Sequence, residues 1–345
     1  MNDGIAANTI RSLGRSGLKV SALCLGAMMF GDQADEETSG RIVAKAREAG
    51  VNFIDTADAY GAGKSEEIVG RAVKADRDRW VIATKAGYPA GAAIPVDLSR
   101  RYLLHAAEQS LRRLGTDRID LYYLHRDDPT VPLEETVRAI ADLVHQGKVR
   151  YFGVSNFRAW RVAQVVRLCD ELGIDRPAAC QPQYNAMNRM PEAELLPACG
   201  YYGIGVVPYS PLARGVLTAK YASVDQLPEG SRAARKDRRL LQTELRPESI
   251  RLAQQIQAHA QAHGSTASHF ALNWVLNNAL VDSVIAGPRT LEQWDDYLAA
   301  LGRPFTAEDE ALVDRLVPAG HPSTPGFTDP VYPVTGRVPR TSRAA

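Results

Sequence analysis

Four residues whose side chains could move a proton follow one another along the chain, each at or just after the end of a short apolar run. Asp55 ends VNFID, Lys85 ends WVIATK, His125 follows IDLYYL, and Tyr60 lies five residues beyond Asp55. An ammonium group near a phenol favours the phenolate, so Tyr60 beside Lys85 is a candidate acid for a carbonyl oxygen that gains negative charge. Two simpler interpretations stay open. Tyr60 could be a packing residue, and Asp55 with Lys85 could be an ion pair that neutralises both.

Other polar residues end the later apolar runs in the same way. They are Ser155 and Asn156 after YFGV, Gln181 at the end of AACQ, and Tyr209 and Ser210 after IGVVP. In a parallel (β/α) barrel the C-terminal ends of all strands meet at one rim, where such barrels place their chemistry. We therefore expect these side chains to share one site with the four residues above.

The elements that would build this rim alternate regularly along the chain. Eight near-continuous apolar runs are typical of parallel strands buried on both faces; they are residues 21–25, 51–55, 80–84, 119–124, 149–154, 178–181, 204–208 and 282–286. Between them apolar residues recur at helical spacing, as in 99–114, where Ser99 is expected to cap the N-terminus and Gly115 the C-terminus. The alternation predicts the α/β class and one (β/α)8 TIM barrel domain over residues 9–336.

Three segments fall outside the bare barrel. Residues 10–20 predict a β-hairpin that turns between Gly14 and Gly17 and caps the closed end of the barrel. Residues 212–246, after the seventh strand, predict a long basic loop at the functional rim, either a lid over an anionic ligand or a solvated connection. The tail from Pro318 is rich in Pro and Gly, and it is expected to be either disordered or a strap near the barrel mouth. Residues 337–345 are expected to be disordered in both cases.

Composition narrows the class of protein. The 345 residues carry a net charge of +1, with 45% hydrophobic and 23% charged residues, which is typical of a globular protein and gives no reason to expect nucleic-acid or membrane binding. The N-terminus lacks an apolar signal region and no run approaches about 18 apolar residues, so we expect a cytoplasmic location. The four cysteines show no CxxC spacing, and we expect reduced core residues and no metal site; they are Cys24, Cys169, Cys180 and Cys199.

Seven spaced motifs together resemble the aldo-keto reductase superfamily. In chain order they are DTADAYGAGKSEEIVGRA, the lysine of WVIATKAG, LYYLHRDDP, YFGVSNF, QPQYN, VVPYSPLARGVLTAKY and AGPRTLEQ, and the similarity covers essentially the whole chain. Within the superfamily the chain is similar to a bacterial branch of oxidoreductases related to potassium-channel β-subunits. The resemblance implies reversible reduction of aldehydes and ketones by hydride transfer from NADPH. It also implies that Tyr60 is the proton donor, that Asp55 and Lys85 tune it, and that His125 orients the carbonyl.

The resemblance further implies a nicotinamide cofactor bound without a Rossmann fold, and the chain has no GxGxxG after a strand. NADPH is expected in preference to NADH, because Arg289 opens a helix and its planar fork suits a 2′-phosphate. Two positions depart from the pattern: Tyr297 stands where asparagine often contacts the adenine, and Ala219 where glycine is frequent. The implied cofactor-binding residues are Gly26, Asp55, Ser155, Asn156, Gln181, Tyr209, Ser210, Pro211, Leu212, Gly215, Lys220, Arg232, Gly287, Arg289, Gln293 and Tyr297.

The substrate pocket is expected to be apolar and adaptable. No charged group beyond the quartet clearly points at the substrate, which favours aldehydes and ketones, bulky ones included, without phosphate or carboxylate groups. Two alternative functions stay open: an NADP-sensing subunit with little turnover, and an aldolase that uses Lys85 as the nucleophile. Assembly into a homo-oligomer also stays open. The predicted pocket residues are Met28, Met29, Phe30, Tyr88, Phe327 and Tyr332.

Overall fold

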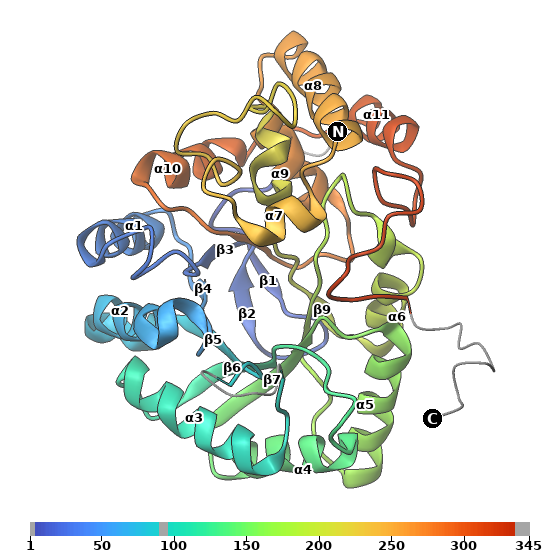
Figure 1. The fold of residues 1–345 in the computed structure, drawn as a ribbon. Helices are drawn as coiled ribbons and strands as arrows, with labels where there is room; N and C mark the ends of the chain where they lie inside the picture. The colour runs from blue at the N-terminus through green and yellow to red at the C-terminus, as the bar shows by residue number, and fades with distance from the viewer. Residues whose placement is uncertain (1–3, 90–95, 335–345) are drawn as a thin grey trace, which may run out of the picture.

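Eight parallel strands form a barrel at the centre of the molecule, with helices around it (Figure 1). The computed structural model describes residues 4–89 and 96–334. The ring closes because the N–H of Asp282 donates to the carbonyl of Val206, and that of Ile285 to Pro208, each at 3.0 Å. The predicted (β/α)8 barrel is thereby confirmed. In order around the ring the strands are β3 (Leu23–Gly26), β4 (Phe53–Asp55), β5 (Val81–Ala86), β6 (Ile119–Leu124), β7 (Val149–Ser155), β8 (Ala179–Gln181), β9 (Gly205–Val206) and β10 (Val284–Ala286).

The helices between the strands begin and end where local signals predict. The Ser99 side chain accepts a hydrogen bond from the N–H of Tyr102 at 3.3 Å, and Gly115 ends the same helix with φ of 61°. The left-handed conformation of Gly115 suits a residue without Cβ. The helices of the outer ring are α1 (Glu36–Glu48), α2 (Lys64–Val73), α3 (Arg100–Leu114), α4 (Leu133–His145), α5 (Ala159–Leu172), α6 (Leu195–Tyr202), α9 (Ala267–Asn277) and α10 (Leu291–Ala300), with α8 (Pro247–Ala262) and α11 (Ala307–Leu316) outside it.

Alternate strand residues separate two hydrophobic clusters. Leu23 and Leu25 face the helices, whereas Cys24 between them joins Phe53 and Tyr123 inside the barrel. This alternation follows from the two-residue period of a strand, and it explains why both faces of each strand are apolar. All four cysteines are buried with free thiols.

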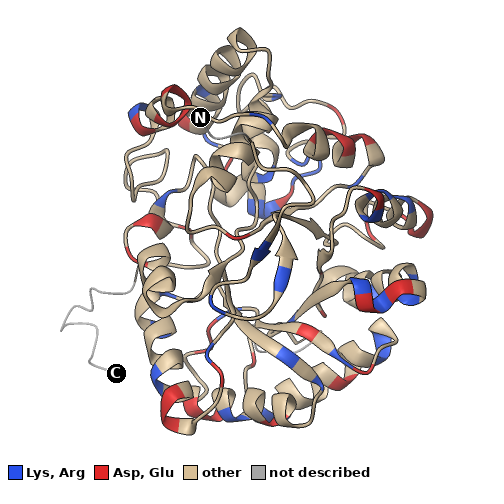
Figure 2. Cartoon of the chain, turned by 180° about the vertical axis from the view of Figure 1, so that it is seen from behind, with Lys and Arg blue, Asp and Glu red and all other residues tan. Residues whose placement is uncertain are grey.

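The outward faces of the helices carry charges of both signs (Figure 2). On α4, Arg138 pairs with Glu134, four residues earlier, at 2.8 Å. On α5, Arg167 pairs with Glu171, which is also four residues away in the sequence. Such exposed pairs contribute little to stability, about 0.3–0.5 kcal/mol each. In the described ranges no helix combines the length and apolar character that crossing a membrane would require.

The predicted hairpin is present and covers the closed end of the barrel. Strands β1 (Ile10–Ser12) and β2 (Lys19–Ser21) pair antiparallel, and Leu13 between them is fully buried in the barrel interior. The N–H of Gly14 donates to Asp282 at 2.9 Å, where the chain enters β10. Gly14 has φ of 55°, and a Cβ there would lie 2.4 Å from the carbonyl oxygen of Gly203, so the turn requires glycine.

At the open end, the basic loop after β9 crosses the barrel mouth. It contains the short turn η4 (Ala213–Thr218) and helix α7 (Arg238–Thr243). Arg235 donates to Gln33 beyond β3 at 2.7 Å, and Arg289 at the start of α10 donates to the carbonyl of Gly230 at 3.2 Å. The loop is therefore packed against the rim on two sides.

The tail forms a strap over the same rim as far as it is described. The N–H of Ser323 donates to the carbonyl of Met187 at 2.8 Å, and Arg189 donates through its N–H to His321 at 3.0 Å. The predicted disordered segment 337–345 lies outside the described residues. For 318–334 the strap, rather than a disordered end, is the observed arrangement.

Candidate active site

The Lys85 ammonium group is the centre of a buried polar cluster at the strand ends. Its Nζ donates to Asp55 Oδ1 at 2.5 Å, to the carbonyl of Thr56 at 2.7 Å and to the Tyr60 hydroxyl at 3.2 Å. These three acceptors use all three donors of an ammonium group. The Lys85 side chain is 0% exposed and that of Asp55 is 4% exposed, so the pair is fixed by strands β4 and β5 and shielded from water.

The second oxygen of Asp55 ties this cluster to the opposite side of the barrel. Gln181, at the end of β8, donates from its side-chain Nε2 to Asp55 Oδ2 at 2.9 Å. The main-chain carbonyl of Gln181 accepts a hydrogen bond from the Ser155 hydroxyl at 2.9 Å. Asn156, with φ of 59°, donates to Ser155 at 3.0 Å and accepts from the Tyr209 hydroxyl at 2.8 Å. The polar strand ends therefore form one connected network, as their sequence positions predict.

His125 stands beside Tyr60 on the cavity side of the cluster. The rings of Tyr60 and His125 lie edge to face with centroids 5.9 Å apart, and Tyr88 approaches His125 from another side at 4.8 Å. Nδ1 of His125 is buried and has no hydrogen-bond partner within residues 4–89 and 96–334. A hydroxyl and an imidazole thus border the same space.

Burial dominates the protonation of this cluster. It raises the pKa of Tyr60 more than the charge of Lys85 lowers it, so the expectation that Lys85 makes the phenol easy to ionise is wrong. Burial, and then the charge of Lys85, hold the pKa of His125 well below its ordinary value, and the imidazole is neutral at pH 7. Burial acts to lower the pKa of Lys85, but Asp55 and Tyr60 outweigh it and raise the pKa, so the amine stays charged.

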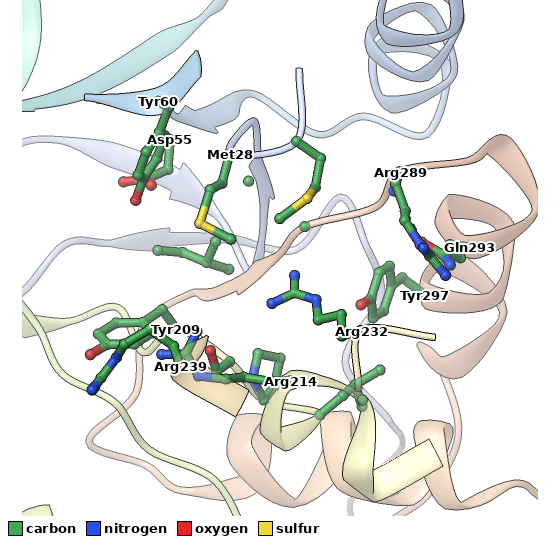
Figure 3. A pocket seen from close by; sticks show the side chains of 18 of the residues that line it. Met28, Asp55, Tyr60, Tyr209, Arg214, Arg232, Arg239, Arg289, Gln293 and Tyr297 are labelled. Atoms are coloured by element: carbon green, nitrogen blue, oxygen red, sulfur yellow. Dashed lines mark hydrogen bonds between the residues drawn. The ribbon is translucent and has the colours of Figure 1, made fainter. Parts of the chain in front are cut away.

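A cavity of about 550 Å³ extends from this cluster to the start of α10. Figure 3 shows Asp55 and Tyr60 at one side of it and Arg289 with Gln293 at the other. The predicted residues that line it are Gly26, Met28, Met29, Asp55, Tyr60, Tyr88, His125, Ser155, Asn156, Gln181, Tyr209, Ser210, Pro211, Leu212, Gly215, Lys220, Arg232, Gly287, Arg289, Gln293, Tyr297 and Tyr332.

Three predicted residues are absent from the cavity wall. Lys85 lies beneath Tyr60. Phe30 is fully buried in the core between barrel and helices, and Phe327 lies under Arg246, whose guanidinium carbon is 3.8 Å from the ring centroid. The prediction of Phe30 and Phe327 as pocket residues is therefore corrected. Sequence reasoning missed several lining residues, of which Arg214 lies within the quoted motif VVPYSPLARGV and Arg239 within the basic loop; the others are Thr218, Ser268, Ile285, Glu292 and Asp296.

Several cations that line the cavity toward α10 have no carboxylate of the described residues within close ion-pair distance. In the described chain, Arg214, Lys220 and Arg289 form no salt bridge, and Arg232 reaches Asp237 only at 3.7 Å. Burial, followed by Arg289 and Arg232, lowers the pKa of Lys220, as expected where like charges crowd together. Such a cluster fits an anionic ligand, which would supply the missing negative charge. The donors and the length of the cavity thus fit a nicotinamide nucleotide with its phosphates at this side.

The segment that carries these cations has an unusual backbone. Between residues 210 and 219, four non-glycine residues have φ between 45° and 58°, in the left-handed region. These conformations cost about 1–3 kcal/mol each and concentrate at ligand sites. Ala219 has φ of 56°, and this left-handed conformation accounts for the frequent glycine at this position in the family that the chain resembles. The other three are Ser210, Ala213 and Arg214.

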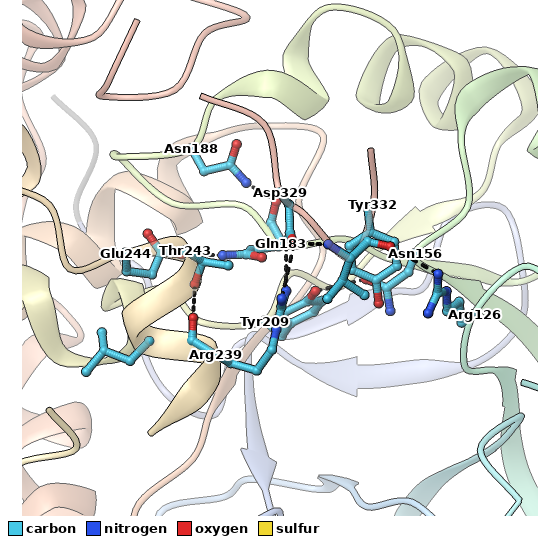
Figure 4. Close-up of polar contacts among 12 residues, drawn as sticks. Arg126, Asn156, Gln183, Asn188, Tyr209, Arg239, Thr243, Glu244, Asp329 and Tyr332 are labelled. Carbon is cyan, nitrogen blue, oxygen red and sulfur yellow. Dashed lines mark hydrogen bonds and ion pairs between the residues drawn. The ribbon is translucent and has the colours of Figure 1, made fainter. Parts of the chain in front are cut away.

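The strap closes the cavity beside Tyr88, whose hydroxyl lies 3.4 Å from that of Tyr332, and is held by the basic loop. Arg239 on α7 forms a two-pronged ion pair with Asp329, with N–O distances of 3.1 and 2.5 Å (Figure 4). Arg126 donates to the carbonyl of Val331 at 3.0 Å, which places Tyr332 at the wall. Loop and strap are therefore joined at the barrel mouth.

Comparison with known proteins identifies the family. A sequence model of the Aldo/keto reductase family matches residues 22–318. The chain belongs to the aldo/keto reductase family. It is 39% identical over 319 residues to a putative voltage-gated potassium channel subunit beta of Schizosaccharomyces pombe, covering 89% of this chain and 90% of that protein. It is 34% identical over 330 residues to L-glyceraldehyde 3-phosphate reductase of Escherichia coli K12, covering 90% and 92%. Family membership supports an oxidoreductase that acts with a nicotinamide cofactor.

Proposed function

We propose that this protein is an NADPH-dependent reductase that converts aldehydes and ketones to alcohols, in a reversible reaction. The observation that carries the proposal is the Tyr60 hydroxyl, 3.2 Å from Lys85 Nζ, at one side of a cavity whose other side carries Lys220 and Arg289, which form no salt bridge among the described residues. A proton donor and a binding site for a long anion are the two parts that such a reaction requires.

Each residue of the quartet has a distinct proposed task. Tyr60 keeps its proton until a carbonyl oxygen gains negative charge and then donates it. Lys85 stabilises the phenolate left behind, and Asp55 keeps Lys85 charged and in place. His125, as a neutral imidazole, orients the carbonyl oxygen. Bound NADPH would supply the hydride.

The preference for NADPH over NADH is proposed from the cations near α10. Arg289 precedes the helix, and its backbone N–H donates to Gln293 Oε1 at 3.0 Å, so the helix start is rigid. Arg289→Ala should weaken NADPH binding by about 1.5–3 kcal/mol, the range of a hydrogen bond to a charged group, and NADH binding far less. Fluorescence titration of both cofactors measures this, and equal weakening of the two would refute the assignment.

The substrate side of the cavity favours carbonyl compounds without a phosphate group. Arg239 at that side is neutralised by Asp329, while Met28 and Tyr88 present apolar surface. One relative is an L-glyceraldehyde 3-phosphate reductase, so a test must include that class. A panel of aryl, alkyl and phosphorylated aldehydes with both cofactors would decide, and failure of every carbonyl with either cofactor would refute the reductase proposal.

A regulatory subunit with little turnover is the second candidate, because the Schizosaccharomyces pombe relative is named as a putative potassium channel β-subunit. The same panel separates the two functions, since a sensor would bind NADPH with little carbonyl-dependent oxidation. An aldolase that uses Lys85 as nucleophile has less support, because that amine is buried and all its donors are engaged.

A further inference from the structure

One carboxyl group in the segment that carries Tyr60 has no task in the proposed reaction. Asp58 lies two residues before Tyr60, on the loop after β4, and it is not among the residues that line the cavity in the described chain. Its Oδ2 accepts a hydrogen bond from the hydroxyl of Tyr102, in the first turn of α3, at 3.0 Å. Its Oδ1 is buried and has no hydrogen-bond partner among the described residues.

The surroundings of Asp58 are unfavourable for a charge. Burial raises the pKa of Asp58 to about 7, against the effect of the hydrogen bond from Tyr102, and the nearby Glu66 adds to the rise. Glu66 is fully buried on α2 and is held by Arg113 at 2.6 Å. A carboxyl group kept here at such a cost needs a reason other than stability.

The loop that Asp58 belongs to is joined to β5 on one side, by backbone hydrogen bonds and by the Lys85 ammonium group, which donates to the carbonyl of Thr56 at 2.7 Å. The N–H of Thr56 donates to Ala83 at 2.8 Å, and the N–H of Asp58 donates to the carbonyl of Lys85 at 3.2 Å. The side chain of Asp58 adds a contact in another direction, to α3. Tyr102 is itself fixed, because its N–H donates to the Ser99 cap of that helix.

Beyond Asp58 the chain provides little rigidity of its own. Tyr60 begins the single turn η1 (Tyr60–Gly63), in which Gly61 has φ of 56° and Gly63 has φ of 93°. Glycines leave the backbone many conformations. The direction of the Tyr60 side chain therefore depends on anchors on both sides of this turn, which are Ser65, bonded to Thr56 and to the carbonyl of Ala27 at 2.7 Å each, and Asp58.

We propose that Asp58 is a positioning residue: through the Tyr102 hydroxyl it holds the loop against α3 and keeps the Tyr60 hydroxyl within hydrogen-bond distance of Lys85. The kinetic part of this proposal rests on Tyr60 being the proton donor. The structural part, a loop anchored at Asp58, does not.

Three variants test the proposal. Asp58→Ala removes the acceptor, Tyr102→Phe removes the donor, and Asp58→Asn keeps an acceptor while removing the charge. Tyr184→Phe is the matched control, because the Tyr184 hydroxyl donates to Glu192 at 2.7 Å outside the cavity wall. Misplacement of a reacting group by about 1 Å can cost about 100-fold in rate, so we expect Asp58→Ala and Tyr102→Phe to lose roughly 10- to 100-fold in kcat. The KM for NADPH should stay unchanged, and Asp58→Asn should recover most of the rate.

Hydrogen exchange of the segment 56–63, measured without substrate, is the second readout. It should accelerate in Asp58→Ala and Tyr102→Phe, but not in Asp58→Asn or Tyr184→Phe. Unchanged exchange together with unchanged kcat would overturn the proposal, as would an Asp58→Asn variant as slow as Asp58→Ala. If the wild type reduces no carbonyl while exchange still accelerates, the proposed function fails and the anchoring of the loop stands.

Discussion

The two sides of the cavity neutralise their charges in opposite ways. Around Lys85 every donor has a protein acceptor, and the side chains come from strand ends buried in the barrel. On the other side, Arg214 and Lys220 form no salt bridge in the described chain and Arg232 reaches Asp237 only at 3.7 Å; the three cations come from the basic loop, part of which has a left-handed backbone. The groups proposed to transfer a proton are thus held in place by the protein itself, whereas the cations proposed to bind the cofactor have charges that a ligand would complete.

We expect the largest effect on the side of the cavity that holds Tyr60 and Lys85. Tyr60→Phe deletes the proposed proton donor but leaves the cationic side intact. We expect kcat to fall by about 10²–10⁴-fold, the usual contribution of general acid catalysis, with NADPH binding nearly unchanged. Single-turnover rates and fluorescence titration measure the two quantities. A Phe variant that keeps more than about half of the rate, when chemistry limits turnover, would remove Tyr60 from the mechanism.

The cationic side should respond in binding rather than in chemistry. Replacing Lys220 and Arg232 together by Gln should raise the NADPH off-rate by roughly 10-fold or more, since each charge-assisted contact is worth about 1.5–3 kcal/mol. The effect should shrink as salt rises. Arg138→Gln with Arg167→Gln removes the same charge from the outer helices and serves as the control in stopped-flow displacement. An unchanged off-rate in the first variant would leave the loop without a role as a lid.

Asp58 offers a test of stability against pH. Its pKa is about 7 when folded, mainly through burial, against an ordinary value of 3.8. As pH rises, the unfolded chain therefore loses this proton before the folded chain does. The contribution of protonated Asp58 to the free energy of unfolding is complete below about pH 4 and is lost as pH rises through 7. Among the groups facing it, Tyr102 and Arg113 favour the charge, while Glu66 opposes it. Asp58→Asn should flatten the decline between pH 4 and 7 by roughly 1–2 kcal/mol. Urea unfolding of both proteins across this range would detect it, and parallel curves would contradict the assignment.

The smallest effect is expected at the strained loop. Ala219→Gly relieves a φ of 56° at the cost of a more flexible unfolded chain. The net gain should be about 0.5–1 kcal/mol, because left-handed strain in an L-residue slightly exceeds the entropy of glycine. Thermal unfolding measures it. A lower melting temperature would mean that the methyl group of Ala219 makes a contact worth more than the strain.

Local signals made the fold predictable from the sequence. Ser99 and Gly115 mark the ends of α3 because capping and left-handed geometry depend on neighbouring residues alone. The gathering of Asp55 and Lys85 follows from a general property of parallel barrels. What depends on the direction of a side chain beyond a strand end was not predictable: Phe30 turns into the core although Met28 lines the cavity.

The net result of opposing effects on a pKa could not be predicted from the sequence either. The proximity of Lys85 and Tyr60 indicated the direction in which the charge acts, but the net pKa depends on how deeply the phenol is buried. Phe327 was placed in the pocket as an aromatic residue of the strap, and only the structure reveals that Arg246 covers it. The energetic cost of burying Asp58 Oδ1 without a hydrogen-bond partner among the described residues likewise depends on three elements that come together only in the folded chain.

The mixture of charges on the outer helices has a consequence for encounters in solution. The chain carries a net charge of only +1, and both signs are interspersed over its surface (Figure 2). Their fields cancel at a distance, and at physiological ionic strength screening is nearly complete beyond about 8 Å. An anion approaching the protein is therefore not steered from afar but meets the attraction of the cavity cations only at its mouth. Its capture rate should follow the size of that opening more closely than the salt concentration.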